Sequence, residues 1–384
     1  MRILAVALVF LAGAALADTP VSIGYLRVAE PVPPTLSNLD PPPEDLGPAG
    51  ALTGVADANT TGRFLGRTYA LTQYDVAEGE DPTDAAIAAL TESPFLLIDG
   101  AADVQTTIAD LPEADGALLF NVSSGDGTLR DGACRANLLH TAVSDAMRTD
   151  ALAQFLVQRR WTDLALITGP QDADAAFAEA LRASLPKFGL ELSAEKAWDI
   201  DADMRRNAAQ EVPLFTQDLG DYDALIVVDE IEDFGRYIAY NTWQPRPIVG
   251  SEGLVPRAWA PVVEQWGAAQ LQSRFIEEHA RPMRSRDYAA WAAVVALSEA
   301  VTRTESTDPA TLRAYLLGPD FELAGFKGRP LTFRPWNGQL RQPIPLVHER
   351  ALVAQAPLEG FLHQRNEMDS LGLDEPESDC EAFQ

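Results

Sequence analysis

Short apolar runs alternate with helical stretches along most of this chain, and that alternation limits the possible folds more than any other feature of the sequence. The first series of apolar runs is VSIGYL (21–26), YALTQYD (69–75), PFLLID (94–99) and GALLFNV (116–122). Helical stretches lie between them near 49–59, 82–92 and 103–110. Strands that alternate with helices form right-handed βαβ units and a parallel sheet covered on both faces. The first series therefore predicts one Rossmann-like lobe.

A second series of the same kind predicts a second lobe. Its apolar runs are LALITG (164–169), LELSAEKAWDI (190–200), ALIVVDE (224–230) and PIVGSEG (247–253). Further helices are predicted at 172–189, 262–279, 287–304 and 309–317, and short strands and turns at 321–356. We expect an α/β fold of two Rossmann-like lobes with parallel sheets joined by a hinge. The expected boundaries are 18–142 and 268–320 for lobe 1, 143–267 and 321–360 for lobe 2, and 361–384 for an acidic tail.

The N-terminus has the pattern of a secretory signal peptide. The segment MRILAVALVFLAGAALADTP has one arginine, an apolar stretch and the small-residue site Ala15-Leu16-Ala17. This stretch is shorter than a membrane-spanning helix, which needs about 18 apolar residues. Residues 1–17 are therefore predicted to be removed. Because residue 18 is Asp and not Cys, we expect a periplasmic protein without a lipid anchor.

The charge of the chain and its two cysteines limit the kinds of molecule and metal that it is expected to bind. The chain carries 57 acidic and 29 basic residues, a net charge of −28, which argues against nucleic acid and anionic membranes as partners, and no membrane insertion is expected. Two cysteines in an oxidising compartment most simply form one disulfide, here between Cys134 and Cys380. Two thiols so far apart in sequence, without clustered histidines, do not indicate a metal site.

Patterns of catalytic sites are missing from the sequence. The four histidines are scattered, and neither G-x-S-x-G nor H-E-x-x-H occurs. The stretch DIDADMRRNAAQ (199–210) begins like a calcium loop, but Met204 and Gln210 stand where such a loop needs glycine and glutamate. SSGDGT (123–128) lacks the G-K-[ST] ending of a nucleotide-binding loop. We therefore expect that the protein is not an enzyme.

Open parallel sheets bind ligands beyond the carboxyl ends of their strands. In this chain those ends lead into the loops 27–47, 100–103, 122–135, 170–174, 229–236 and 250–259. The first loop has seven prolines between Pro31 and Pro48, which is consistent with a stiff flap over the gap or with a disordered excursion. The loop at 122–135 combines glycines, serines and arginines, as a cradle for a carboxylate or phosphate would.

Three segments resemble the type I periplasmic binding proteins of the branched-chain amino acid class. They are GALTGVADANTTGRFLGRTYAL (50–71), HTAVSDAMRTDALAQFLVQRRWTDLALITG (140–169) and PIVGSEGL (247–254). Four more look like the subfamily associated with pyrroloquinoline quinone (PQQ) dependent alcohol dehydrogenase systems. These are TLRDGACRANLLHT (128–141), RSRDYAAWAAVVALSEAV (284–301), FKGRPLTFRPWNGQLRQPIPL (326–346) and PLEGFLHQRNEMDSLGLDEPESDC (357–380).

The resemblance implies a receptor that closes around a small molecule, with an ABC permease or a quinoprotein dehydrogenase as partner. PQQ, as a bound ligand rather than a cofactor, is the leading hypothesis. Another small metabolite, such as an amino acid, an amide or an alcohol-derived acid, is the alternative, and a sensory or interaction module without transport is the third.

PQQ is a flat quinone with three carboxylates, so its site needs arginine forks and aromatic rings. The predicted ligand-binding residues are Arg27, Ser123, Ser124, Arg130, Arg148, Glu252, Arg257 and Trp259. Each arginine could instead pair with one of the many acidic residues. Glu252 aligns with the acid that holds the ammonium group in amino acid receptors of the family, so it either faces another partner or indicates an amine ligand. The basic stretch 325–341 either meets the ligand or pairs with the acidic surface of the protein.

Overall fold

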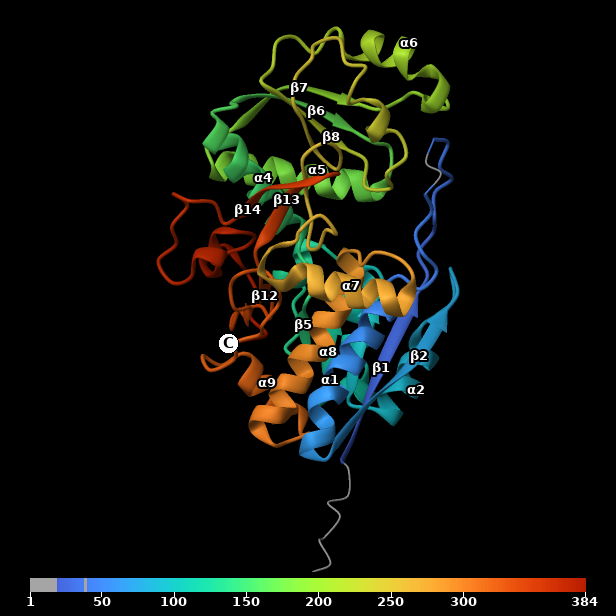
Figure 1. Cartoon of the computed structure of the whole chain (residues 1–384), viewed down its shortest axis with the longest axis vertical. Helices are drawn as coiled ribbons and strands as arrows, with labels where there is room; N and C mark the ends of the chain where they lie inside the picture. The colour runs from blue at the N-terminus through green and yellow to red at the C-terminus, as the bar shows by residue number, and fades with distance from the viewer. Residues whose placement is uncertain (1–18, 38–39) are drawn as a thin grey trace, which may run out of the picture.

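A computed structural model describes residues 19–37 and 40–384, so the predicted signal peptide 1–17 lies outside the described residues. The described chain forms two lobes stacked along the long axis of the molecule (Figure 1). Each lobe contains a parallel sheet with helices on both faces. The predicted α/β fold of two Rossmann-like lobes is confirmed.

Lobe 1 contains a five-stranded parallel sheet of order β2-β1-β3-β4-β5. Its strands are β1 (Thr19–Val28), β2 (Arg67–Val76), β3 (Phe95–Asp99), β4 (Leu118–Asn121) and β5 (Leu138–His140). The first four match the predicted apolar runs. The sequence did not predict β5, whose LLH stretch lacks the β-branched residues that mark the equally short β9.

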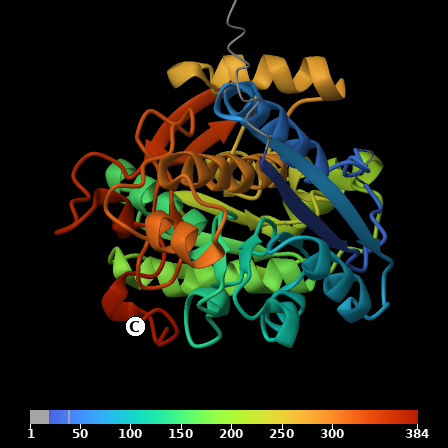
Figure 2. The same ribbon diagram turned by 90° about the horizontal axis from the view of Figure 1, so that it is seen from below.

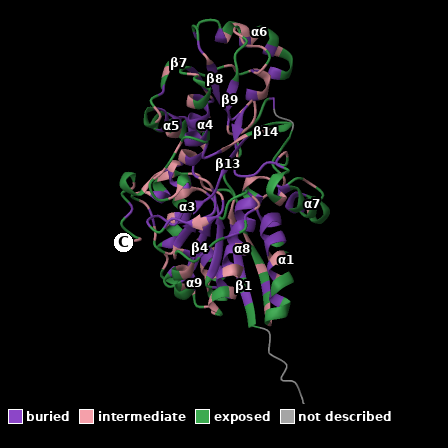
Figure 3. Cartoon of the chain, turned by 60° about the vertical axis from the view of Figure 1, so that its left-hand side comes forward, coloured by how far each residue is buried: buried purple, intermediate pink, exposed green. Residues whose placement is uncertain are grey.

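The helices of lobe 1 come from both ends of the chain. They are α1 (Pro48–Leu65), α2 (Thr83–Glu92), α3 (Ala102–Ala109), α7 (Ala268–His279), α8 (Ser285–Thr304) and α9 (Pro309–Leu316). Helices α1 and α8 pack closely because small residues face each other, and a Cβ on Gly50 would lie 1.9 Å from the Asp287 carbonyl oxygen. Helix α7 lies outside this pair (Figure 2). Figure 3 shows that α8 is largely buried, whereas α7 exposes one face.

Lobe 2 contains a four-stranded parallel sheet of order β7-β6-β8-β9. Its strands are β6 (Asp163–Thr168), β7 (Glu191–Ala197), β8 (Ala224–Val228) and β9 (Ile248–Gly250). Helices α4 (Asp145–Arg159) and α5 (Asp172–Lys187) cover one face, and α6 (Met204–Thr216) covers the other. The sequence did not predict α6. Its aspartate-rich start is the N-cap of this helix, where Asp203 accepts the N–H group of Arg205.

Small antiparallel sheets complete the link between the lobes. Strands β10 (Val255–Pro256), β13 (Ile344–His348) and β14 (Ala351–Ala356) form one, and β11 (Thr332–Phe333) pairs with β12 (Leu340–Arg341). The chain therefore passes between the lobes three times, after β5, after β10 and between β12 and β13. Side chains from 259–263 and 321–340 pack in the core of lobe 1, although the sequence placed both segments in lobe 2. The sequence could not mark these changes, because an apolar residue fits either core.

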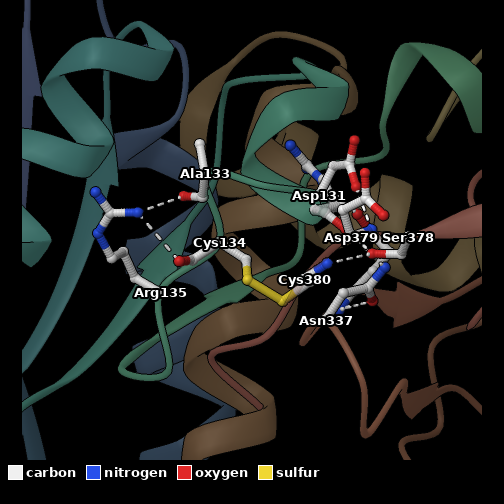
Figure 4. Close-up of a disulfide and its surroundings, with 10 residues drawn as sticks. Asp131, Ala133, Cys134, Arg135, Asn337, Ser378, Asp379 and Cys380 are labelled. Carbon is white, nitrogen blue, oxygen red and sulfur yellow. Dashed lines mark hydrogen bonds between the residues drawn. A yellow bond between two sulfur atoms is a disulfide. The ribbon is translucent and has the colours of Figure 1, made fainter. Parts of the chain in front are cut away.

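The acidic tail is irregular in conformation, as expected, and it is anchored to the body. It contains two short 3-10 helices, η5 (Glu367–Ser370) and η6 (Glu375–Glu377). The expected disulfide joins Cys134 to Cys380 and closes a separation of 246 residues (Figure 4). Beside it, Ser378 Oγ donates to the Arg130 carbonyl oxygen at 2.8 Å. The tail therefore stays next to the end of lobe 1.

The basic stretch 325–341 pairs with this tail. The guanidinium groups of Arg334 and Arg341 both donate to the Asp369 carboxylate, at 3.0 and 2.7 Å from Nε, and all three side chains are buried. Lys327 is buried as well and donates to Gln342 Oε1 at 2.5 Å. The sequence left open whether this basic stretch meets a ligand or pairs with acidic groups of the protein, and the structure shows the second.

Within residues 19–37 and 40–384, helices that combine the length and apolarity needed to cross a membrane do not occur.

Candidate functional site

The carboxyl ends of both sheets open into the gap between the lobes. Strand β1 runs toward lobe 2, and the loop that follows it reaches the far side of the gap (Figure 1). This loop bonds to residues that follow β7 and β8, which shows that the two edges face each other. Ligands of open parallel sheets lie at such edges. The gap between the lobes is therefore the candidate site.

The loop between β1 and α1, residues 29–37 and 40–47, is here named the proline strap. Leu36 and Ser37 donate their backbone N–H groups to the Asp233 carboxylate at 3.1 and 2.5 Å. The Ser37 hydroxyl accepts the first N–H group of α6 at 2.9 Å. Of the two alternatives for this loop, the described residues form an ordered strap that leaves lobe 1 and docks on lobe 2.

Two cavities lie along this gap. One, of about 290 Å³, lies beside the crossing after β10 and is named the hinge pocket. It takes residues from the edge of lobe 2 and from the segment before α8 in lobe 1. Its charged and aromatic lining includes Glu232, Arg236, Glu252, Arg257, Trp259 and Arg284. The other, of about 300 Å³, lies between the proline strap and lobe 2 and is named the strap pocket.

The hinge pocket contains three of the predicted site residues: Glu252, Arg257 and Trp259. Arg257 Nη2 donates to Glu232 Oε1 at 2.7 Å, and the two side chains are 40% and 39% exposed. Burial raises the pKa of the Glu252 carboxyl above its ordinary value, and Glu349 and Glu232 raise it further. Glu252 and Arg257 are both partly exposed, so a small molecule in the pocket can reach them.

Trp259 forms the aromatic side of the hinge pocket. Its ring stacks on Tyr288 with a centroid distance of 4.8 Å and an interplanar angle of 11°. Its Nε1 donates to Gln272 Oε1 at 2.9 Å, so the indole N–H is satisfied inside the protein. The ring is held rigidly and contributes shape more than hydrogen bonds.

Arg148 lies next to the hinge pocket in a network that the protein itself neutralises. Its guanidinium donates to both oxygens of Glu230, at 2.6 and 3.0 Å, and to Asp145 Oδ1 at 3.0 Å. Ser251 donates its hydroxyl to the same Glu230 at 2.6 Å. Burial opposes the charged form of Arg148, but the two carboxylates outweigh it and raise its pKa. Arg148 is therefore already paired.

The loop at 122–135 also uses its polar groups internally. Arg130 is only 2% exposed, and its donors bond to Gln339 Oε1 and to the carbonyl oxygens of Ser124, Asp126 and Ala142. Ser123 donates to the Gly100 carbonyl oxygen and accepts the Gly100 N–H group. The Ser124 hydroxyl accepts the Asp126 N–H group at 3.4 Å.

Arg130 therefore joins the crossing after β5 to the loop after β4, and four of its five N–H groups bond to oxygen atoms of the protein itself. The expected cradle is a structural loop, because the buried Arg130 guanidinium directs its hydrogen bonds to the protein and is not exposed to a ligand.

Arg27 supports the proline strap at its base. Its Nε donates to Asp75 Oδ1 at 2.8 Å, and its Nη1 donates to the Glu44 carbonyl oxygen at 2.5 Å. Arg27 therefore holds the returning end of the strap on lobe 1, away from both pockets.

The sequence analysis missed a charged group at the edge of lobe 1. Tyr25 donates its hydroxyl to Asp99 Oδ2 at 2.8 Å, and Arg286 pairs with Asp99 Oδ1 at 3.2 Å. Asp99 ends β3, so its position at a strand end was a signal that could have identified it. Arg286 gave no such signal, because it comes from a helix that is distant in sequence.

The expected lining of the gap was cationic, and the structure corrects this. The hinge pocket has three arginines and three glutamates: Arg236, Arg257, Arg284, Glu232, Glu252 and Glu349. The strap pocket has four aspartates in its lining and no lysine, arginine or histidine: Asp199, Asp201, Asp229 and Asp233. Among the residues that the structure describes, three or more His, Cys, Asp or Glu side chains never gather as metal ligands would.

Comparison with known proteins agrees with this architecture. Residues 42–203 match the family model described as periplasmic binding protein. The comparison with curated proteins found no match.

Three solved structures illustrate the similarity. A leucine-, isoleucine-, valine-, threonine- and alanine-binding protein from Brucella ovis, in a closed conformation, is 14% identical; the match covers 94% of this chain and 98% of that one, with a TM-score of 0.70. A branched-chain amino acid ABC transporter periplasmic ligand-binding protein from Burkholderia xenovorans LB400 is 14% identical, with 95% and 100% covered and a TM-score of 0.69. A branched-chain amino acid transporter substrate binding protein from Streptococcus pneumoniae, in complex with isoleucine, is 14% identical, with 88% and 99% covered and a TM-score of 0.62.

These similar proteins carry the names of binding proteins and not of enzymes. The chain has the two-lobed α/β fold of the type I periplasmic binding proteins, and its residues 42–203 match the family model of periplasmic binding proteins.

Proposed function

We propose that this chain is an exported receptor that captures a small solute in the hinge pocket and presents it to an ABC permease. One observation carries the proposal: the hinge pocket takes its walls from both lobes beside a crossing segment. A molecule bound there touches both lobes, so its binding energy favours one relative placement of them. The predicted signal peptide 1–17 and a periplasmic location are part of this proposal.

The charges of the hinge pocket favour a solute that carries both signs. Arg257 and Glu252 are both accessible there, and they are oriented by separate elements. A carboxylate would pair with the Arg257 guanidinium, and an ammonium group would pair with Glu252. A zwitterion such as an amino acid supplies both groups, and amino acids are what the similar proteins from Brucella ovis and Streptococcus pneumoniae bind.

PQQ is the second candidate, because the hinge pocket brings arginines together with a rigid tryptophan. Its three carboxylates would have to draw the guanidinium groups away from their present partners. The exposed pair of Arg257 with Glu232 separates at little cost, since exposed ion pairs are worth about 1 kcal/mol or less. This subfamily assignment would also make a quinoprotein dehydrogenase the partner in place of a permease.

The test is a titration of the purified mature protein with PQQ and with a panel of amino acids, followed by tryptophan fluorescence and calorimetry. A receptor is expected to bind its solute with a dissociation constant of about 1 μM or tighter. Saturable binding of an amino acid with no response to PQQ supports the zwitterion, and the reverse result supports PQQ. No binding of either kind would leave the interaction-module alternative as the better reading.

The variant Glu252→Gln separates the two ligands by the sign of its effect. It removes a negative charge at nearly constant shape. The affinity for an amine-bearing ligand should therefore fall, and the affinity for a triply anionic ligand should rise. Glu191→Gln, an exposed change on β7 in lobe 2, is the matched control and should leave both affinities unchanged.

A further inference from the structure

We propose that the strap pocket is a second binding site, which takes an organic cation with an apolar or aromatic body. The cavity of about 300 Å³ is at the lower end of the range of small-molecule pockets, about 300 to 1,000 Å³. It is separate from the hinge pocket and shares no lining residue with it.

The sign of the charge comes from the walls of the pocket. Four aspartates line it, and the lining contains no basic residue. Asp199 and Asp201 are exposed at the end of β7, and within the described part of the chain neither side chain has an ion pair. The nearby Arg205 and Arg236 pair with other carboxylates, on Asp203 and Asp40. The carboxylates of Asp199 and Asp201 therefore give the pocket a negative charge that no ion pair within the described part of the chain neutralises.

The apolar surfaces of the pocket favour an organic ion over a metal ion. The rings of Trp198 and Phe234 stack at a centroid distance of 4.4 Å and an angle of 6°, and both border the cavity. Ile200 and Ile231 add aliphatic surface. Among the described residues the carboxylates do not converge as metal ligands. Aromatic rings attract cations whose charge is spread over an organic group.

The proline strap supplies the remaining wall. Pro34 and Leu36 line the cavity from the proline strap, and hydrogen bonds from the backbone N–H groups of Leu36 and Ser37 to the Asp233 carboxylate hold them there. Leu36 would otherwise be an apolar side chain at a polar edge. A cation in this pocket would touch lobe 2 and the strap together, so the site exists only while the strap is docked.

The probe pair for this site is 2-phenylethylammonium and 2-phenylethanol, which have the same body and differ in charge. Calorimetry on the mature protein is expected to give saturable binding of the ammonium probe with a dissociation constant below about 1 mM, and at least tenfold weaker binding of the alcohol. Equal binding of the two probes, or no saturable binding of the ammonium probe, would overturn the proposal.

The double variant Asp199→Asn and Asp201→Asn locates the binding. It should lower the affinity for the ammonium probe at least tenfold. The control is the double variant Asp115→Asn and Asp320→Asn, which makes the same charge change on exposed residues of lobe 1. This control should change the affinity less than twofold. An unchanged affinity in the first variant places the probe elsewhere and contradicts the proposal. Because Glu252→Gln should leave the probe unaffected, this result stands or falls separately from the proposed function.

Discussion

The two pockets of the interlobe gap differ in how the fold deals with charge. In the hinge pocket, arginines and glutamates occur in equal number, and neighbouring Arg148 is neutralised by two carboxylates. In the strap pocket, carboxylates gather without a basic residue in the lining. The hinge pocket is therefore suited to a solute that exchanges partners with existing ion pairs, and the strap pocket to a ligand that supplies the missing charge. A net charge of −28 hides this difference completely.

The largest expected effect tests whether charges near the hinge pocket are fixed by the protein. Arg148→Ala should lower the free energy of unfolding by about 3 to 5 kcal/mol, because Asp145 and Glu230 would stay largely buried without their cation. Urea unfolding measures it. Arg182→Ala, which breaks an exposed pair with Glu195, is the control and should cost less than about 1 kcal/mol. Equal losses of stability in the two variants would contradict the conclusion that the protein itself neutralises the charges next to the hinge pocket.

The next prediction concerns the proline strap. The variant to make replaces Pro33 and Pro34 by glycine and Leu36 by serine. Its affinity for 2-phenylethylammonium should be about 10-fold to 100-fold lower, because one apolar wall is lost and the strap becomes more flexible. The ligand of the hinge pocket should keep its affinity within about twofold, a small difference on the free-energy scale. Calorimetry with both ligands on the same sample checks this. A parallel loss at both pockets would show that they are one site.

A smaller effect is expected from Arg257→Ala. The solute that saturates the protein in the titration should bind about fivefold to tenfold more weakly, because one charge-assisted hydrogen bond is lost. The melting temperature should stay nearly constant, since the pair with Glu232 is 40% and 39% exposed. Unchanged affinity together with a large loss of stability would give Arg257 a structural role instead.

The smallest expected effect is a dependence of probe binding on pH in the strap pocket. Burial raises the pKa of Asp229 to about 6, and burial also raises the pKa of neighbouring Asp174. As the pH falls from 7 to 5, Asp229 takes up a proton and loses its negative charge, while the ammonium probe stays charged. Probe affinity should therefore fall by about twofold to fivefold.

Titrations of the probe at several pH values measure this effect, with 2-phenylethanol as the neutral reference. Asp229→Asn, which keeps one acceptor oxygen for the backbone N–H groups of Phe234 and Gly235, should remove the pH dependence. A persistent slope in that variant would assign the titration to another group.

Much of the fold could be predicted because it rests on local patterns. Eight strands follow apolar runs of adequate length, and alternation with helices requires parallel sheets. The elements that were not predicted have weak local signals: β5 is a short stretch without β-branched residues, and α6 begins with aspartates and contains Pro213. The pairing of Cys134 with Cys380 was predictable because two cysteines allow only one bridge.

The candidate site was harder to predict, because the role of an arginine depends on which oxygen atoms surround it. Arg27, Arg130 and Arg148 all follow or precede strand ends, as a ligand-binding residue would. Arg27 holds the strap, Arg130 joins a crossing to a loop, and Arg148 neutralises carboxylates. Only Arg257 of the predicted arginines lies in a pocket wall.

The sequence by itself determined that two parallel sheets would form and that their carboxyl edges would carry polar loops, because hydrophobic periodicity acts over a few residues. Tertiary structure decided which charges meet: Ser37 and Asp233 are 196 residues apart, yet their contact closes the strap pocket. Electrostatic pairing acts over a few ångströms in space and is indifferent to distance along the chain. Whether a charged residue is paired or left to a ligand is therefore settled only when the lobes come together.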